Sequence, residues 1–352
     1  MFSTILIFLA ILAVLVLAHE AGHFWVARRN GVRVDEFGFG FPPRLVSWKK
    51  GQTRYSINLI PLGGFVKIHG EQGEGRGDSD SFASKPAGKR AKIIVAGVLM
   101  NFILAIVLMS FGNIIGMPGV VAEAESGAKI RDEKIQITGV LADSPAEKAG
   151  FQAGDILVGF KNENEFQGFI KQNEGQNIEI KVARGKEILN LQVVPKISQD
   201  SQGPVIGVSI AKTGIISYPV WQSFIKGIVD TINLIFLIVQ IAGKLIYQAF
   251  LGESVMNVLA GPVGIYKITA QAAGMGFSYI LNLIILLSIQ LGIINILPFP
   301  ALDGGRLLFL AIEKIKGKPV SQKVENIIHT IGFALLMLLM AVITWRDIIR
   351  FF

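Results

Sequence analysis

The sequence predicts a polytopic α-helical membrane protein of about four transmembrane helices, with a membrane-embedded β-hairpin loop and an inserted β-rich domain. Three observations predict this class. The 352 residues are 51% hydrophobic and only 17% charged, whereas an ordinary soluble domain is about 25% charged. Long uncharged runs alternate with polar stretches, and the central polar stretch has the residue pattern of short strands. We therefore expect three parts, at residues 1–118, 119–217 and 218–352.

Four segments are apolar and close enough to the length of about 20 residues that crossing a bilayer requires. The fourth reaches this length only with its flanks. The segments are Phe2–Val26, Ile93–Met117, Ile280–Leu297 and Ile331–Thr344. No basic residue precedes the first segment, so we expect it to be retained as a helix and not cleaved as a signal peptide.

A fifth apolar segment, Thr231–Gly243, is bounded by Lys226, Asp230 and Lys244. An uncharged core of about 13 residues is short for a span. We expect this segment to be interfacial or re-entrant.

Composition and charge narrow the classes of function. Basic residues that flank membrane helices explain the net charge of +8, so the expected partner is the lipid bilayer and not nucleic acid. The chain has no cysteine. It therefore has no disulfide framework, and any metal must be held by His, Asp or Glu.

The first span ends in a metal-binding motif, His19-Glu20-Ala-Gly-His23, after an uncharged run from Met1 to Ala18. Histidines four residues apart lie on one face of a helix, where two imidazoles can share a metal ion. Glu20 lies beside them as a candidate general base for water. Polar groups at the end of an apolar span are costly, which indicates a functional site.

A catalytic zinc usually takes three protein ligands and leaves one position for water. The candidates for the third ligand are His69, His329 and carboxylates near the membrane. Asp303 stands out because it follows the third span, after a helix broken by Pro298 and Pro300, and before two glycines that free the backbone. Zinc would supply the counter-charge that such a carboxylate needs. A helix-capping role is the alternative.

Two polar regions complete the chain. In the loop 28–92, Phe37–Pro43 and Tyr55–Ile68 have the pattern of short strands broken by Gly and Pro, which predicts hairpins close to the membrane. Residues 71–81 have the composition of a flexible linker. The stretch Gly119–Ser217 contains Ser144-Pro-Ala-Glu-Lys-Ala-Gly-Phe-Gln-Ala-Gly-Asp155, which closely resembles bacterial PDZ domains. Such domains bind extended peptides by strand addition, and a generic β-domain is the alternative.

Together these features resemble the site-2 protease family of intramembrane zinc metalloproteases, and within it the bacterial regulators of sigma-E-type stress responses. The resemblance also includes Gly261-Pro-Val-Gly and Asn295-Ile-Leu-Pro-Phe-Pro-Ala-Leu-Asp303-Gly-Gly. It implies that Zn²⁺ is the cofactor, that Asp303 is the third ligand, and that Asn295 takes part in substrate handling. Only one PDZ domain fits in the insert, whereas the well-studied enterobacterial member carries two in tandem.

The resemblance further implies that the loop Arg54–Gly70, including Gly63, Gly64 and Phe65, holds the substrate in an extended form. A transmembrane helix hides its peptide bonds in its own hydrogen bonds, so a sheet edge must offer replacement partners. The implied activity is regulated intramembrane proteolysis by a zinc endopeptidase. The implied substrates are single-pass membrane proteins, such as anti-sigma factors or remnant signal peptides, with other peptide segments bound by the PDZ domain.

A shared metal ion would restrict the topology. His19, His23 and Asp303 would lie at one depth in the membrane, each near the C-terminal end of its span, so the first and third spans must cross in the same direction. The second span already returns the chain, so Thr231–Gly243 should not cross as a single helix. The loop after the first span carries 13 Lys and Arg, which predicts that it is cytoplasmic. We thus expect a multi-pass protein of the bacterial inner membrane with an extracytoplasmic PDZ domain, although Arg346 and Arg350 point weakly the other way.

Two other classes of protein share some of these features. A membrane-anchored PDZ adaptor with a structural metal site would have no use for Glu20. A zinc transporter would need several metal-binding residues along a path, and the sequence has one evident cluster. A cleavage assay together with zinc stoichiometry separates the three.

Overall fold

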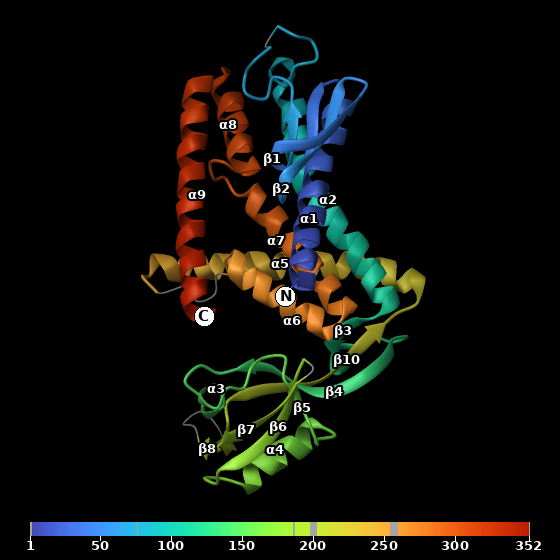
Figure 1. Ribbon diagram of the computed structural model, residues 1–352, viewed down its shortest axis with the longest axis vertical. Coiled ribbons are helices and arrows are strands. Elements are labelled where there is room, and N and C mark those ends of the chain that lie inside the picture. Colours follow the sequence, from blue (N-terminus) through green and yellow to red (C-terminus); the bar gives the residue numbers. More distant parts are fainter. Residues whose placement is uncertain (1, 76, 186, 198–202, 254–259, 352) are drawn as a thin grey trace. The chain divides into compact units, whose positions relative to one another are not determined.

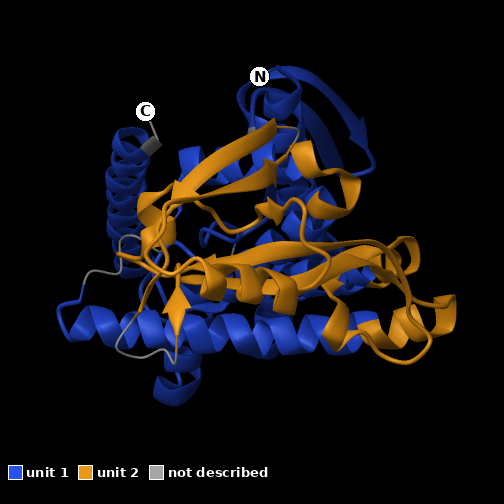
Figure 2. Ribbon diagram, turned by 90° about the horizontal axis from the view of Figure 1, so that it is seen from below, with its two compact units in different colours: residues 1–109, 227–273, 280–352 blue, residues 110–226, 274–279 orange. Residues whose placement is uncertain are grey.

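The computed structural model describes the chain except for residues 1, 76, 186, 198–202, 254–259 and 352. It divides into two compact units (Figure 2). The first comprises Met1–Met109, Gly227–Ala273 and Ile280–Phe352, and the second comprises Ser110–Lys226 and Gly274–Tyr279. The expected β-rich domain at 119–217 lies within the second unit.

Each of the four expected spans falls within or closely overlaps a long helix (Figure 1). These helices are α1 (Phe2–Arg29), α2 (Ala87–Ile115), α7 (Phe277–Ile296) and α9 (Gln322–Phe351). Together with α5, five of the described helices are long and apolar enough to cross a membrane. The polytopic helical class is therefore confirmed, while the expected end of the second span at Met117 is wrong, because Met117 begins a strand.

The fifth apolar segment is much longer than the sequence suggested. Residues 231–243 belong to one continuous helix, α5 (Val220–Phe250), of 31 residues. The charged residues that seemed to bound the segment, Lys226, Asp230 and Lys244, lie within this helix and do not interrupt it. The length argument was therefore wrong. In the first unit, α5 runs across the direction of α1 and α9 (Figure 1).

Helix α6 (Pro262–Met275) begins at the Gly261-Pro-Val-Gly motif, and α9 supplies its cap. The buried Asp347 carboxylate accepts hydrogen bonds from the backbone N–H groups of Gly261 and Gly264, at 2.8 and 2.9 Å. A Cβ on Gly264 would lie 2.9 Å from the same oxygen. The motif thus provides free N–H groups at a helix start and the space for a carboxylate to reach them.

The loop after α1 forms a hairpin that folds back on itself, from β1 (Val34–Lys50) and β2 (Thr53–Ile68). The first part of β1 pairs along one edge with residues 64–68 and along the other with residues 54–57, and residues 44–50 pair with 53–58. The two strands therefore act as a sheet of four segments. Residues 64–68 form an outer segment whose far edge has no strand partner among the described residues.

A small core joins this sheet to the helices. It contains the last turns of α1, the outer ends of the hairpin, the 3₁₀ helix η1 (Phe82–Ser84) and the first part of α2. Its buried side chains are Phe24, Ala27, Val32, Val34, Ile68, Phe82, Ile93 and Ile94. This packing holds the C-terminal end of α1 against α2.

The expected linker at 71–81 is not a free segment. Its described residues form hydrogen-bonded turns, including Ser81 N–H to Asp78 O at 3.1 Å. Glu71 pairs with Arg306, and Asp78 lies 2.8 Å from His69 Nε2. The Gly-, Asp- and Ser-rich composition of this segment therefore forms tight turns, and Glu71 links the segment to a distant part of the sequence through Arg306.

The second unit contains a six-stranded antiparallel sheet in the order β3-β10-β4-β5-β6-β7. The apolar core lies under this sheet and includes Ile137, Val182 and Phe166. The elements of this unit are β3 (Met117–Val120), the 3₁₀ helix η2 (Val121–Glu123), β4 (Lys129–Val140), α3 (Pro145–Lys148), β5 (Ile156–Leu157), α4 (Glu163–Gln172), β6 (Ile178–Arg184), β7 (Glu187–Val193), β8 (Lys196–Ile197), β9 (Pro204–Val205) and β10 (Val208–Ser217).

The motif that resembles PDZ domains builds a short helix and a tight turn. The Ser144 hydroxyl caps α3 by accepting from Glu147 N–H at 3.2 Å, and Pro145 occupies the first turn. The buried Asp155 receives two hydrogen bonds from Arg184, at 2.7 and 2.8 Å. The bidentate pair fixes the end of this turn to β6.

Candidate metal centre

Helix α1 supplies two imidazoles from one face. His19 and His23 are 8% and 7% exposed, and their Nε2 atoms lie 3.2 Å apart. The rings meet edge to face, with centroids 4.8 Å apart. This arrangement is the direct result of a four-residue spacing on a helix.

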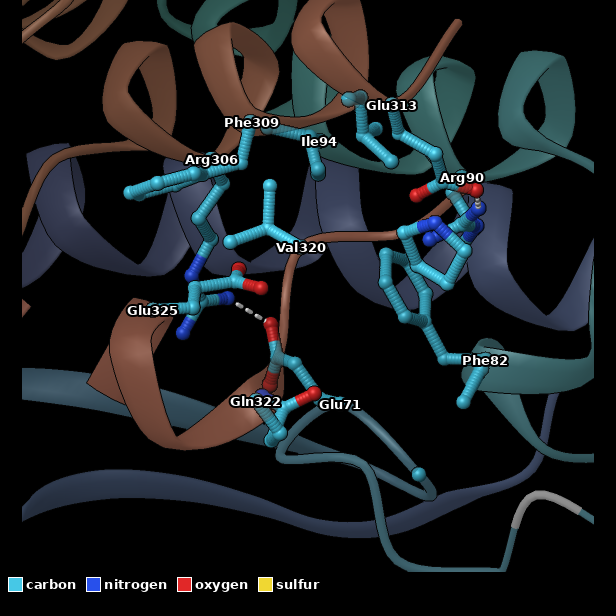
Figure 3. A pocket seen from close by; sticks show the side chains of 14 residues that line it. Glu71, Phe82, Arg90, Ile94, Arg306, Phe309, Glu313, Val320, Gln322 and Glu325 are labelled. Carbon is cyan, nitrogen blue, oxygen red and sulfur yellow. Dashed lines mark hydrogen bonds and ion pairs between the residues drawn. The ribbon is translucent and has the colours of Figure 1, made fainter. Parts of the chain in front are cut away.

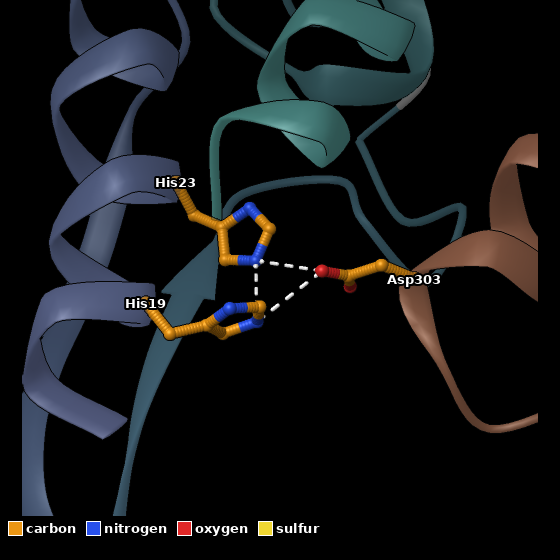
Figure 4. Close-up of side chains that lie close together, drawn as sticks. All are labelled: His19, His23 and Asp303. Carbon is orange, nitrogen blue, oxygen red and sulfur yellow. Dashed lines mark hydrogen bonds and ion pairs between the residues drawn. The ribbon is translucent and has the colours of Figure 1, made fainter. Parts of the chain in front are cut away.

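A carboxylate from the far end of the sequence completes the group. Asp303 is the first residue of α8 (Asp303–Lys316). Its Oδ2 lies 3.2 Å from Nε2 of His19 and 3.2 Å from Nε2 of His23 (Figure 4). The structure thus brings together the three residues that the sequence analysis selected.

The three atoms fit a zinc ion. Bond lengths of 2.0–2.1 Å in tetrahedral geometry place neighbouring ligands about 3.3 Å apart, and the observed separations are all 3.2 Å. Asp303 Oδ2 is buried and makes no hydrogen bond of normal geometry with a described residue. A set of two imidazoles and one carboxylate leaves a fourth position for water or substrate.

The stretch before α8 aims Asp303 at the histidines. Ala301 has φ +76°, a left-handed conformation that is rare for a residue with a side chain. Its backbone N–H donates to His329 Nδ1 at 2.8 Å. His329 is therefore not a ligand of the centre in this structure; it is a hydrogen-bond partner of the turn that precedes Asp303.

The two glycines after Asp303 serve close packing and not conformational freedom. Neither has a positive φ. A Cβ on Gly304 would lie 2.1 Å from Leu297 O, and one on Gly305 would lie 2.4 Å from Phe299 O. The expectation that they free the backbone is wrong, because α8 begins directly against the turn that precedes it and only glycine fits there.

Helix α2 forms the wall behind the two histidines. A Cβ on Gly97 would lie 2.3 Å from His23 Nε2, and one on Gly22 would lie 2.2 Å from Ala96 O. One turn after Gly97, the fully buried Asn101 places its amide 3.3 Å from His19 Nδ1. The sequence analysis missed these residues; the signal was an uncharged polar residue in an apolar span, four positions after a glycine.

Glu20 is half-buried next to His19 in α1. Its carboxylate lies within electrostatic reach of both imidazoles, of Asp303 and of Glu71. A carboxylate this close to the ligand residues, and not one of the three that converge, is a candidate general base.

The expected substrate-binding residues fall in two places. Gly64 and Phe65 begin the outer segment of the sheet and Gly63 directly precedes it. A Cβ on Gly64 would lie 3.5 Å from the Val16 side chain, one turn before His19. Asn295 is half-buried in the last turn of α7, and its amide makes no hydrogen bond with a described residue.

A second group of ligand-type side chains, His69, Asp78 and Asp80, also lies in the first unit. Arg33 donates to it: its guanidinium lies 2.9 Å from His69 Nδ1 and 3.3 Å from Asp80 Oδ2. The His69 Nε2 atom lies 2.8 Å from Asp78. Both ring nitrogens are therefore engaged, which removes His69 as a third ligand for the first group.

A pocket of about 250 Å³ lies along α8 beside the metal centre (Figure 3). Two ion pairs, Arg306 with Glu71 and Arg90 with Glu313, line it. Burial lowers the pKa of Arg306, but the carboxylates of Glu71 and Asp303 outweigh burial and raise it. A wall lined by charged side chains thus begins within one helical turn of Asp303.

Comparison with known proteins identifies relatives across almost the whole chain. The family model "Peptidase family M50" matches residues 7–339. The zinc metalloprotease RasP of Oceanobacillus iheyensis is 32% identical, over 99% of this chain and 100% of its own. The regulator of sigma-W protease RasP of Bacillus subtilis is 31% identical, over 99% of both chains. The regulator of sigma-E protease RseP of Escherichia coli is 32% identical, over 97% of this chain and 98% of its own.

Proposed function

Because this chain belongs to peptidase family M50, the site-2 proteases, and is a multi-pass zinc metalloendopeptidase, we propose that it cuts peptide bonds within transmembrane helices of other proteins. The expected family, enzyme class and cofactor are confirmed. The observation that carries the proposal is the group of His19, His23 and Asp303, with atoms 3.2 Å apart, whose two histidines lie on a helix apolar enough to span. A site in such a helix acts on substrates in the same membrane.

In this proposal His19, His23 and Asp303 hold the zinc ion, which when bound polarises the scissile carbonyl and makes water a stronger nucleophile. Glu20 takes the proton from the attacking water and passes it to the leaving amine. The two imidazoles are electrostatic neighbours of the Glu20 carboxylate.

The outer segment of the β1–β2 sheet holds the substrate. Gly64 and Phe65, directly after Gly63, present a strand edge that pairs with no strand among the described residues, beside Val16 and Leu17 of α1. An unwound substrate helix needs new partners for its peptide groups, and a free sheet edge supplies them. Asn295, eight residues before Asp303, contributes its free amide to the same task.

The chain lies in the inner membrane with the loop after α1 on the cytoplasmic side and the β-rich domain outside. The basic residues of the loop support this orientation, and α5 lies along the membrane surface, as its direction across α1 and α9 supports. Since the chain lacks cysteine, single cysteines test this orientation at two exposed positions. Glu174 lies in the β-rich domain, and Lys318 follows α8, in a segment with several lysines that this orientation places in the cytoplasm. A membrane-impermeant thiol reagent should label only Glu174→Cys in intact cells, and the reverse pattern would overturn the orientation.

The second unit is a PDZ domain that binds an extended apolar peptide. A groove of about 460 Å³ runs between α4 and the first part of β10. There, Val208–Lys212 pairs with β4 on one side and has no strand partner among the described residues on the other. Gln167→Glu places a charge at an exposed position in the lining of this groove and should weaken binding of an apolar peptide to the full chain; unchanged binding would remove this role.

The substrates are single-pass membrane proteins. Two relatives are named as regulators of sigma-W and sigma-E. By that likeness we propose anti-sigma factors as the substrate class here, with remnant signal peptides as a second class.

The decisive experiment uses Glu20→Gln in the full chain. We expect the variant to keep its zinc and its fold, and to cleave a model transmembrane substrate about 10²- to 10⁴-fold more slowly, because the general base is lost. It should also retain substrates on purification. Glu74→Gln, the same change at an exposed site in the same unit, should cleave normally. Full activity in Glu20→Gln would overturn the proposed role.

A further inference from the structure

Helix α2 supplies a second partner to each imidazole of the metal centre. The Nδ1 atom of His23 lies 2.9 Å from the backbone carbonyl of Ile93. The Nδ1 atom of His19 lies 3.3 Å from the side-chain amide of Asn101. Both rings therefore turn their Nε2 atoms toward Asp303 (Figure 4).

The two partners differ in what they can accept. A neutral imidazole that binds a metal through Nε2 carries its proton on Nδ1, so Nδ1 must find an acceptor. The carbonyl of Ile93 is an acceptor and serves His23 directly. For His19 the acceptor has to come from Asn101, whose amide offers both an oxygen and an NH₂ group.

The structure leaves the amide of Asn101 able to turn. Its Nδ2 faces His19, while its Oδ1 is buried without a hydrogen-bond partner among the described residues. Rotation by 180° exchanges the two atoms in nearly the same positions, and no described residue donates a hydrogen bond to Oδ1 that would oppose the rotation. With Nδ2 toward the ring the amide serves a His19 protonated on Nε2, and with Oδ1 toward the ring it serves a His19 that binds metal there.

The backbone holds the amide at this position. Asn101 is fully buried, and its carbonyl accepts from the Ser288 hydroxyl of α7 at 2.8 Å. Gly97, one turn earlier, lets α2 approach the histidine rings. The amide is thus fixed in place and free only in its orientation.

We propose that Asn101 is a positioning residue for the zinc centre, which presents its side-chain oxygen to His19 Nδ1 and so selects the tautomer that binds zinc through Nε2. This inference goes beyond the proposed function, because it concerns the affinity of the centre for its metal. It holds whatever the substrate is.

The test compares two substitutions in the full chain, purified in detergent. Asn101→Leu has nearly the same size and no acceptor, and Asn101→Asp keeps acceptor oxygens. Zinc affinity is measured by competition with a chromophoric chelator. Loss of a partner of a metal-binding histidine typically lowers metal affinity 10- to 100-fold, so we expect this loss in Asn101→Leu and affinity close to that of the wild type in Asn101→Asp.

Asn113→Leu is the matched control. It makes the same change at another buried asparagine of α2, 12 residues after Asn101, so it should keep wild-type zinc affinity. Wild-type affinity in Asn101→Leu would overturn the proposal. Equal loss in Asn101→Asp would also overturn it, because packing and not the acceptor would then be responsible; this second variant decides the question alone if the leucine variant does not fold. The readout is metal affinity, so it is independent of whether the proposed cleavage is found.

Discussion

Two clusters of histidine and carboxylate groups lie in the first unit, and they differ in what occupies their lone pairs. In both, ligand-type atoms lie within 4.8 Å of one another. Around His69, the guanidinium of Arg33 lies within hydrogen-bond distance of the imidazole ring and of Asp80. The carboxylates of this cluster are open to solvent, and the Asp78 side chain is 55% exposed. Around His19 the Nε2 atoms and a buried Asp303 oxygen face one another. Residue types alone do not make a metal site; free lone pairs that converge in a buried place do.

The largest effect that separates the clusters is the loss of one histidine from each. We expect His23→Ala to lower the zinc content from about one ion per chain to almost none and to abolish cleavage, because two protein ligands do not retain a catalytic zinc. His69→Ala should keep both zinc and cleavage, with stability lower by about 1 kcal/mol for each hydrogen bond lost. Metal analysis of both purified variants checks this, and zinc loss in His69→Ala would make the clusters equivalent.

A smaller effect compares a glycine in each cluster. A Cβ on Gly304 would lie 2.1 Å from the backbone oxygen of Leu297, which cannot give way. We expect Gly304→Ala to lower the free energy of unfolding by about 1–3 kcal/mol or more and to weaken zinc binding, since α8 must shift.

Gly75→Ala is the matched change in the second cluster. The new Cβ would meet the ends of the Asp78 and His69 side chains, at 2.7 and 2.8 Å, and these can move. The cost should be about 1–2 kcal/mol for the left-handed backbone at φ +61°, with zinc affinity unchanged. Thermal unfolding and zinc titration measure both variants; a weaker metal site in Gly75→Ala would contradict the comparison.

The smallest effect comes from removing the guanidinium of Arg33 from the cluster around His69. Arg33→Ala frees the Nδ1 atom of His69 and one oxygen of Asp80. We expect a second, weak zinc ion to bind, visible only at a large excess of zinc. A stoichiometry that stays at one would show that exposure of the carboxylates, and not the guanidinium, keeps metal out.

Local sequence patterns predicted the spans and most of the metal centre. The spacing of His19 and His23 fixed their common face, and an aspartate after a broken apolar helix pointed to Asp303. Asn101 was missed, because its partner lies 82 residues away in the sequence. Similarly, the pairing of Glu71 with Arg306 joins residues 235 apart, which composition of the segment 71–81 could not indicate.

The length of α5 was underestimated for a different reason. A helix that lies across its neighbours keeps charged residues along one side, so hydropathy windows cut it at Lys226, Asp230 and Lys244 although the backbone continues. Periodicity over the full 31 residues, and not the length of the uncharged core, was the informative signal.

The metal centre also has a mechanical meaning. His23 and Asp303 are 280 residues apart in the sequence, and α8 begins against a turn too tight for any side chain at Gly304. An ion shared between them would act as a cross-link that closes a loop containing most of the chain, and such a link removes conformational entropy from the opened state. The residues proposed to hold the zinc ion would therefore also fasten the first helix to the last third of the protein.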